Sequence, residues 1–367
     1  MSISEQHIHQ VISNFAIEGT LTSLEINKEG HINSTYFSTF NDQGTIKKYT
    51  HQKINTEVFK QPVQLMNNIS LVTNHIRSKL IGQYQDVEQR CLRVIPTRAG
   101  DTVYVDEKGA YWRTYRYIDM VKTFKTIENE RQAFLLGEAI GNFQLQLADF
   151  DGSQLYETIP HFHDMGHRYT QLQDAIQVNY QGRLNLVKTE LDFLMENKIR
   201  GCILWDKLQD GSLPVRVTHN DTKMNNVLFS QDGREALCII DLDTVMPGTS
   251  LFDTGDMIRT ATTTAEEDAT DLTLVACNAA LHKALLDGYF SKATFLTPLE
   301  QSLVVESGRT TTQIMAVRFL TDFLNGDTYY HTEHEQHNLD RARNQIALMQ
   351  DMDRKWDILS QEAYTQS

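Results

Sequence analysis

The sequence predicts an α+β protein with a β-rich N-terminal lobe and a mainly helical C-terminal lobe. Runs rich in β-branched and aromatic residues fill most of the chain before residue 120. After that point, apolar residues recur mainly at helical spacing. The length of 367 residues also suits two domains, at roughly 100–200 residues per domain. We therefore place the first lobe at residues 1–118 and the second at residues 119–367.

The strands expected in the first lobe are short β-prone runs bounded by turn residues. They cover residues 21–28, 35–40, 45–54, 91–96, 102–106 and 110–117. Gly30 lies in the hairpin between the first two runs. Pro62 opens the helix expected at residues 62–79, because proline is favoured in the first helical turn.

The second lobe begins with a strongly helical pattern at residues 128–150. Gly137 and Gly141 lie four residues apart in this helix, which would let another element approach closely. Residues 169–196 are also predicted to be helical. A β-rich centre is expected at residues 215–218, 227–229 and 237–241, followed by mainly helical structure from residue 253 onward.

Composition and charge limit the partners of the chain. Lys and Arg total 34 against 48 Asp and Glu, so a net charge of −14 disfavours general binding to nucleic acid or anionic membranes. The four cysteines are far apart and form no C-x-x-C pair, as is typical of reduced thiols. No signal peptide or membrane-spanning stretch is evident. We therefore expect a cytoplasmic protein, for which a monomeric state is plausible.

The segment at residues 217–229 carries the strongest chemical signal. It contains His219, Asp221 and Asn226 in the spacing H-x-D-x-x-x-x-N, and an apolar run ending at Asp241 follows it. Phosphoryl transfer passes through a loose transition state, so the protein mainly positions groups and neutralises charge. Asp221 suits the carboxylate that accepts the proton of the attacking hydroxyl. Asn226 and Asp241 suit the ligands that hold Mg²⁺ on the phosphates.

Each of these residues alone has an ordinary alternative, because Asp and Asn are common in turns and caps. The ordered combination of the motif with an apolar strand before each carboxylate favours catalysis. His219 is interpreted as a structural residue that bonds the loop backbone. Asp253 and Asp256 are interpreted as scaffolding for the catalytic loops rather than as metal ligands.

These segments resemble the catalytic and metal-binding loops of the aminoglycoside phosphotransferase superfamily, the kinase-like small-molecule kinases. Within that superfamily, segments 219–229, 240–248 and 252–259 look like those of the N-acetylhexosamine 1-kinases. The resemblance runs from about residue 17 to about residue 350. It implies a two-lobed protein-kinase-like fold with ATP and Mg²⁺ as cofactors.

The resemblance also implies nucleotide-binding residues. Gly30, His31 and Asn33 would belong to a loop that closes over the ATP phosphates, although this loop lacks the G-x-G-x-x-G of protein kinases. An ordinary turn is the alternative. Lys53 on the third strand would steady the phosphates. Lys47 and Lys48 are nearby competitors for that role.

The helix expected at residues 62–79 departs from the pattern of the family, because it contains no Asp or Glu to pair with Lys53.

Three residues correspond to sugar-facing positions of the hexosamine kinases: Thr244, Arg318 and Tyr329. A salt-bridged arginine and a packed tyrosine are the alternative. Two histidine clusters, at 161, 163 and 167 and at 331, 334 and 337, match no recognised zinc spacing.

Together these observations predict an ATP- and Mg²⁺-dependent kinase that phosphorylates the anomeric C1 hydroxyl of an N-acetylhexosamine, with Asp221 as base. One alternative is a kinase-like phosphotransferase for choline, homoserine or an aminoglycoside. Another is a catalytically silent nucleotide-binding regulator, which the presence of all three motif residues disfavours. Sulfatase-type hydrolysis would need a C/S-x-P-x-R motif, and the sequence contains none.

Overall fold

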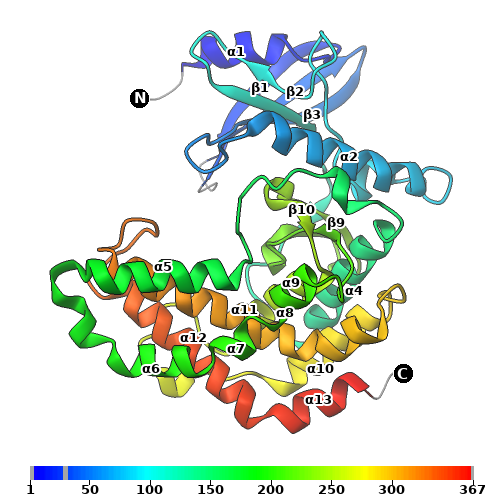
Figure 1. Ribbon diagram of the computed structural model, residues 1–367. Helices are drawn as coiled ribbons and strands as arrows, with labels where there is room; N and C mark the ends of the chain where they lie inside the picture. The colour runs from blue at the N-terminus through cyan, green and yellow to red at the C-terminus, as the bar shows by residue number, and fades with distance from the viewer. Residues whose placement is uncertain (1–3, 28–31, 365–367) are drawn as a thin grey trace. The chain divides into compact units, whose positions relative to one another are not determined.

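The computed structural model describes residues 4–27 and 32–364 (Figure 1). The chain forms two compact units, each discontinuous in sequence. The first consists of Met1–Thr123, Asp149–Ile159 and Val227–Pro247. The second consists of Phe124–Ala148, Pro160–Asn226 and Gly248–Ser367. The domain boundary between residues 118 and 119 stays a prediction.

The first unit is built on an antiparallel five-stranded sheet with the strand order β1-β2-β3-β5-β4. Its strands are β1 (Thr20–Asn27), β2 (Ser34–Asp42), β3 (Thr45–Lys53), β4 (Tyr104–Val105) and β5 (Tyr111–Arg116). Gln43 and Gly44 connect β2 to β3, and both have positive φ angles, of 49° and 93°. A tight hairpin turn needs this backbone conformation, which explains the glycine.

Two helices cover opposite faces of this sheet, as Figure 1 shows. Apolar residues of α1 (Glu5–Ser13) pack with Tyr36, Tyr49 and Trp112 on one face. On the other face, Met66 of α2 (Pro62–Leu80) contacts Arg113 and Tyr115 of β5. The sheet therefore has a mainly apolar side beneath α1 and a side that mixes polar and apolar groups beneath α2.

The first unit also contains a second sheet, of order β6-β8-β9. The strands of this sheet are β6 (Val121–Lys122), β8 (Val227–Ser230) and β9 (Ala236–Ile239). The other elements of the unit are α3 (Val87–Arg90), η1 (Gly152–Gln154), η4 (Leu242–Thr244) and the short β10 (Met246–Gly248), of which only Gly248 belongs to the second unit. The strand predicted at residues 91–96 is wrong. Only Val94 forms an isolated bridge there, to Tyr115, and Pro96 has no N–H to extend the pairing.

The second unit is mainly helical, and α5, α11 and α12 share one apolar core. Its helices are α4 (Glu130–Gln146), α5 (Met165–Val178), α6 (Lys188–Glu196), α7 (Lys198–Gly201), α8 (Ile203–Gln209), α9 (Ser250–Thr262), α10 (Ala279–Phe290), α11 (Pro298–Leu324), α12 (His337–Arg354) and α13 (Trp356–Tyr364). The short elements are η2 (Tyr180–Leu186), β7 (Arg216–Thr218), η3 (Met224–Asn226) and η5 (Leu272–Leu274).

Helices α4 and α10 approach each other through glycines, as the spacing of Gly137 and Gly141 predicts. A Cβ atom on Gly137 would lie 1.9 Å from the carbonyl oxygen of Leu285. From the other side, a Cβ on Gly288 would lie 2.0 Å from the carbonyl oxygen of Phe134. Any side chain at these positions would therefore push the two helices apart.

Residues 169–196 are largely helical, as predicted, but they form three successive elements, α5, η2 and α6, rather than one helix. Helix α5 ends at Val178 because Asn179 adopts the left-handed conformation, with φ of 42°. The side chain of Asn179 then accepts a hydrogen bond from the backbone N–H of Leu184, which stabilises the turn. Within residues 4–27 and 32–364, no helix is long and apolar enough to cross a membrane.

Candidate active site

The motif loop of the second unit runs from β7 to η3 and is fixed by Asp253 at the start of α9. The carboxylate of Asp253 accepts backbone N–H groups from His219 at 3.0 Å and from Asn220 at 2.7 Å. Gln144 donates to the same carboxylate at 3.0 Å. Asn220 adopts the left-handed conformation, with φ of 68°, directly before Asp221. Since the loop follows an unusual path, these bonds are what hold the Asp221 backbone in place.

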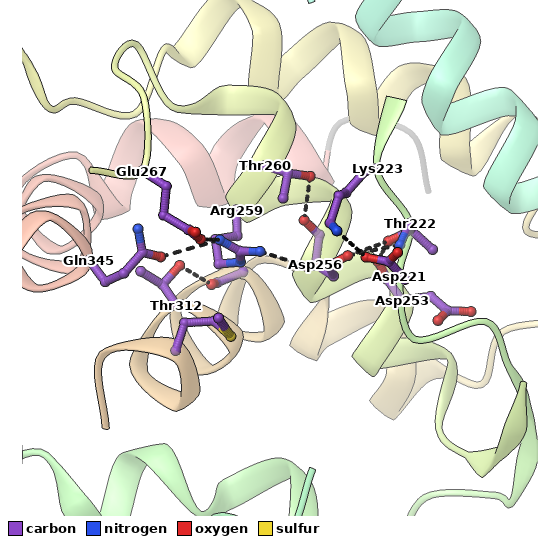
Figure 2. A network of polar contacts seen from close by, with 12 residues as sticks. Asp221, Thr222, Lys223, Asp253, Asp256, Arg259, Thr260, Glu267, Thr312 and Gln345 are labelled. Atoms are coloured by element: carbon purple, nitrogen blue, oxygen red, sulfur yellow. Dashed lines mark hydrogen bonds and ion pairs between the residues drawn. The ribbon is translucent and has the colours of Figure 1, made fainter. Parts of the chain in front are cut away.

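Asp256, one helical turn further along α9, holds the other side of the loop. It accepts the N–H of Thr222 at 2.8 Å and pairs with Arg259 at 3.1 Å, and Arg259 pairs in turn with Glu267 (Figure 2). Burial raises the pKa of Asp256, but the positive charges of Arg259 and Lys223 and the hydrogen bonds from Arg259 and Thr222 together outweigh it and leave the pKa below its usual value. The scaffolding role predicted for Asp253 and Asp256 is confirmed.

His219 is fully buried and bonds within the loop. Its Nδ1 atom accepts the backbone N–H of Asp221 at 3.2 Å, and its ring packs edge-on against Phe143. A ring held in this way orients the neighbouring aspartate. The structural interpretation of His219 is therefore confirmed.

The carboxylate of Asp221 contacts two residues of its own loop. Its Oδ1 atom lies 2.7 Å from the ammonium of Lys223, and its Oδ2 atom accepts the side-chain amide of Asn226 at 2.9 Å. Its side chain is 27% exposed, so a small molecule can reach it. Figure 2 shows Lys223 together with Asp221 and Asp256. Burial alone would lower the pKa of Lys223, but the negative charges of these two aspartates have the larger effect, so its pKa is above the usual value and the side chain stays positively charged.

The side-chain amide of Asn226 is oriented by Asp221. Its amide nitrogen donates both to the backbone oxygen and to the carboxylate of Asp221, each at 2.9 Å. The amide is thereby oriented, and its oxygen remains as a hard ligand of the kind that Mg²⁺ prefers. Asn226 is buried, so this orientation is held by packing as well.

The two carboxylates after β9 in the first unit have different environments. Asp243 is buried and pairs with both terminal nitrogens of Arg113, and the second of these contacts is 3.0 Å long. Asn33 donates a further bond to Asp243 at 2.7 Å. Asp241 is exposed and adopts the left-handed conformation, with φ of 61°. Since Asp243 is neutralised by Arg113, Asp241 is the better metal candidate of the two.

Asn33 also fixes the end of the β1–β2 connection. Its side-chain oxygen accepts the backbone N–H of Asn55 at 2.9 Å, while its nitrogen reaches Asp243. The predicted nucleotide residues Gly30 and His31 lie outside the described residues. Within the described part of the loop, the hydrogen bonds of Asn33 therefore connect the end of β3 to the segment that follows Asp241.

Lys53 ends β3 opposite Trp112 of β5, and residues opposite one another share a face of a sheet. It thus lies on the α1 side, whereas Gln52 and Arg113 lie on the face that carries Asp243. No hydrogen bond or ion pair of Lys53 is found among the described residues. The competing lysines are occupied, because Lys47 pairs with Asp42 at 2.6 Å and Lys48 with Asp119 at 2.7 Å.

The three residues predicted to face the sugar belong to different units. Thr244 lies in η4 of the first unit. In the second unit, the guanidinium of Arg318 lies 5.8 Å from the ring of Tyr329. Arg318 forms no ion pair with any described residue, so the alternative of a salt-bridged arginine does not hold. Tyr329 is 70% exposed rather than packed in a core.

His163, from the first histidine cluster, joins the site as a support of the motif loop. Its Nε2 atom lies 3.0 Å from the side-chain oxygen of Asn220, and its ring stacks on Phe252 of α9 at 4.3 Å. Burial lowers the pKa of His163 to about 3, so the ring is neutral. Its role is to hold Asn220, the residue that precedes Asp221.

Two participants were missed from the sequence. Lys223 could have been found as a cation two residues after the predicted base. Arg113 carries no local signal, because its partner Asp243 lies 130 residues further along the sequence.

The chain matches the phosphotransferase enzyme family over residues 74–290, more than half of its length, and it belongs to that family. Solved structures of small-molecule kinases align along nearly the whole chain. A microcompartment-associated aminopropanol kinase is 13% identical, with a TM-score of 0.63, and covers 97% of this chain and 99% of its own. A choline kinase from Cryptosporidium parvum Iowa II is 14% identical, with a TM-score of 0.57 and coverages of 98% and 99%.

A spectinomycin phosphotransferase solved in complex with ADP and spectinomycin is 12% identical, with a TM-score of 0.51. The alignment covers 100% of this chain and 99% of that one. Identities this low establish the fold alone. The predicted α+β, protein-kinase-like fold is confirmed, as is membership of the phosphotransferase family. The more specific likeness to N-acetylhexosamine 1-kinases stays a prediction.

Proposed function

We propose that this phosphotransferase uses ATP and Mg²⁺ to phosphorylate an N-acetylhexosamine at its anomeric C1 hydroxyl. The observation that carries the catalytic part is the geometry around Asp221. Its carboxylate is reachable from solvent, it is oriented by Asn226 and Lys223, and its backbone is held by Asp253 and His219. Such fixed placement is what a general base requires.

In this mechanism Asp221 accepts the proton of the attacking hydroxyl as the new O–P bond forms, while the bond from the γ-phosphorus to the bridging oxygen breaks and ADP leaves with that oxygen. The hydroxyl takes up one of the two hydrogen-bonding positions that Lys223 and Asn226 fill in the free protein. The released ammonium of Lys223 then lies beside the acceptor oxygen and can stabilise negative charge there. One side chain thus holds the base before substrate binds and balances charge during transfer.

We assign Mg²⁺ binding to Asn226 and Asp241, which the resemblance identifies and whose oxygen ligands suit the ion. When bound, Mg²⁺ would neutralise phosphate charge during transfer. Asn33, together with Gly30 and His31, is assigned to the nucleotide loop. Lys53 stays our candidate for steadying the phosphates because it has no carboxylate partner in the described part of the chain, although it lies on the face of Trp112 rather than that of Asp243.

The hexosamine assignment rests on the resemblance of the motif segments and on Arg318, Tyr329 and Thr244 as sugar-facing residues. Arg318 is positioned by aromatic rings and retains N–H donors that could bind uncharged hydroxyl or acetamide oxygens. The principal alternative is an amino-alcohol or aminoglycoside acceptor, as in the aminopropanol, choline and spectinomycin enzymes. Because Arg318 has no ion-pair partner among the described residues, a positively charged acceptor beside it would meet an unbalanced like charge, which disfavours a cationic acceptor.

A panel of acceptors with ATP and Mg²⁺, monitored by ADP release, tests this proposal. We expect turnover of N-acetylglucosamine or N-acetylgalactosamine and none of choline, homoserine or an aminoglycoside. Phosphorus NMR of the product should show a sugar 1-phosphate. A 6-phosphate would contradict the anomeric assignment alone, and exclusive turnover of an amine would contradict the hexosamine assignment.

Arg318→Ala separates sugar binding from nucleotide binding. The variant should raise the KM for the sugar and leave the KM for ATP nearly unchanged, since removal of the donor leaves sugar oxygens unpaired at a cost of about 1–3 kcal/mol. An equal rise in both KM values would show that Arg318 supports the fold rather than the sugar.

A further inference from the structure

Two arginines of the second unit, Arg168 of α5 and Arg318 of α11, both contact Phe162. The Nη2 atom of Arg168 donates to the backbone oxygen of Phe162 at 3.1 Å. The guanidinium of Arg318 lies 5.6 Å from the Phe162 ring and 5.5 Å from the Tyr330 ring. Neither arginine forms an ion pair with any residue in the described part of the chain.

The hydrogen-bonding capacity of this pair is largely unused. Arg318 has one polar contact, to the sulfur of Met315 at 3.5 Å. Arg168 bonds Gln171 and Phe162, but its Nε atom is buried without a partner among the described residues, as is the hydroxyl of Tyr330. Buried polar atoms are normally paired, so these donors indicate a missing acceptor.

The nearest carboxylates are committed elsewhere. Asp164 exerts an attractive charge on Arg168, but its two oxygens accept the N–H of His167 and contact the ring of His161, at 2.9 and 3.0 Å. Glu267, which acts on Tyr330, pairs with Arg259. Burial, followed by repulsion from Arg318, lowers the pKa of Arg168 to about 10. Among the described residues, neither guanidinium therefore has a carboxylate in direct contact.

This arginine pair is connected to the motif loop by direct contacts. Phe162 is followed by His163, which bonds the side chain of Asn220 at 3.0 Å, and Asn220 precedes Asp221. All of these residues belong to the second unit. A molecule held by the two guanidinium groups would thus lie against the support of the catalytic loop.

We propose that Arg168 and Arg318 form a subsite for an anionic group, a carboxylate or a phosphate, carried by the acceptor that Asp221 activates. The identity of the acceptor rests on the proposed kinase function, whereas the binding of the anion does not. Guanidinium groups match the planar oxygens of both anions through charge-assisted hydrogen bonds. The preferred acceptor is an N-acetylhexosamine with an acidic substituent, and a neutral one binds more weakly through its acetamide oxygen.

Calorimetry without nucleotide tests the subsite directly, with four ligands of similar size. They are N-acetylglucosamine, N-acetylglucosamine 6-phosphate, 2-acetamido-2-deoxyglucuronic acid and glucosamine. We expect one of the two acids to bind at least about tenfold more tightly than the neutral sugar, because charge-assisted bonds are roughly twice as strong as neutral ones. The tighter acid distinguishes phosphate from carboxylate. Protonated glucosamine should bind most weakly.

Two variants and a matched control locate the effect. Arg168→Met and Arg318→Met should each remove most of the advantage of the acid. Arg354→Met removes an arginine that is 64% exposed and pairs with Asp351 at the end of α12, and it should keep that advantage. If Arg168→Met fails to fold, as judged by circular dichroism, the half-buried Arg318 still provides the test.

The proposal is overturned if neither acid binds measurably, if the neutral sugar binds as tightly as both acids, or if both variants retain the preference. ADP release separates this result from the proposed kinase function. Arginine-dependent binding of an acid without turnover of any acceptor would support the subsite and contradict the kinase assignment. Turnover of the neutral sugar without a preference for acids would support the kinase assignment and contradict the subsite.

Discussion

The Oδ1 atom of Asp221 lies 2.7 Å from the ammonium of Lys223, two residues further along the same loop. The base predicted from the motif therefore carries its own counter-ion in the free protein. Asn226 donates to the second carboxylate oxygen, and since each oxygen has a further lone pair, an acceptor hydroxyl can bind beside these contacts or displace the contact with Lys223. The ion pair is partly exposed, so its displacement costs little, about 1 kcal/mol or less.

Asp221→Asn should lower kcat by about 10²–10⁴-fold, because a positioned general base contributes roughly that much. Binding of ATP should survive, since the loop backbone is held by Asp253 and Asp256 rather than by Asp221 itself. Steady-state kinetics together with nucleotide titration measure both effects. A variant with nearly unchanged kcat would show that Asp221 is not the base.

Gly288→Ala should destabilise the second unit, because the new methyl group would meet the backbone oxygen of Phe134. Overpacking of this kind costs about 1–3 kcal/mol or more. Gly166→Ala is the matched control in another helix, where the nearest atom to the added Cβ is 3.4 Å away. Chemical denaturation should show a loss for the first variant and none for the second. Equal stability of both would refute close packing of α4 on α10.

The close approach of these helices was predictable, because Gly137 and Gly141, four residues apart on one helix, are visible as a pattern in a short stretch of sequence. The strands β2 and β3 were predictable for a similar reason, since a Gly44 turn separates two β-prone runs. The break at Asn179 was not, because helical apolar spacing continues on both sides of it. The role of Arg113 was not predictable either, because it depends on a tertiary contact with Asp243, 130 residues away.

The motif residues show where sequence reasoning about the site ends. The H-x-D-x-x-x-x-N spacing brings Asp221 and Asn226 within 2.9 Å, because both lie on one short loop. The family resemblance assigns Lys53 to phosphate binding by its position in the sequence. The face of the sheet that Lys53 occupies is decided by the register of β3 against β5. That register is fixed by the packing of Trp112 and Tyr49 under α1, which only the structure reveals.

Asp106 provides a test of stability against pH in the first unit. Its carboxylate accepts the indole N–H of Trp112 at 2.8 Å and the backbone N–H groups of Lys108 and Ala110, each at 2.9 Å, and its Oδ2 atom bonds the Nε2 atom of His7 at 2.9 Å. Burial raises the pKa of Asp106, but these bonds outweigh it and lower the pKa from 3.8 to about 2. The ionised form is thus stabilised in the folded state by about 2 kcal/mol.

Because the folded pKa is the lower one, this stabilisation is present above pH 3.8 and is lost as the pH falls towards 2. Asp106→Asn should therefore lower the free energy of unfolding by about 2 kcal/mol at pH 7, and the difference from wild type should shrink below pH 4. Asp101→Asn, at an exposed site, is the control. A difference that is constant over pH 2–7 would contradict the role of ionisation.

Asp241→Ala and Asp243→Ala should have separate consequences, although the two carboxylates are two residues apart. Asp243 neutralises the buried Arg113, whose guanidinium would be left without a carboxylate partner. Breaking a buried pair costs about 3–5 kcal/mol, so Asp243→Ala should lower the denaturation midpoint strongly. Asp241 is exposed, and its removal should leave that midpoint nearly unchanged while weakening the binding of Mg²⁺–ATP.

Calorimetric titration of Mg²⁺–ATP and of the sugar into each variant completes this comparison. For Asp241→Ala the affinity for the sugar alone should persist, because the lost charge acts on the metal and the phosphates rather than on a neutral ligand. Unchanged affinity for Mg²⁺–ATP in Asp241→Ala would contradict the metal role. If Asp243→Ala is as stable as wild type, the bond from Arg113 does not hold this segment, and the choice between the two carboxylates loses its physical basis.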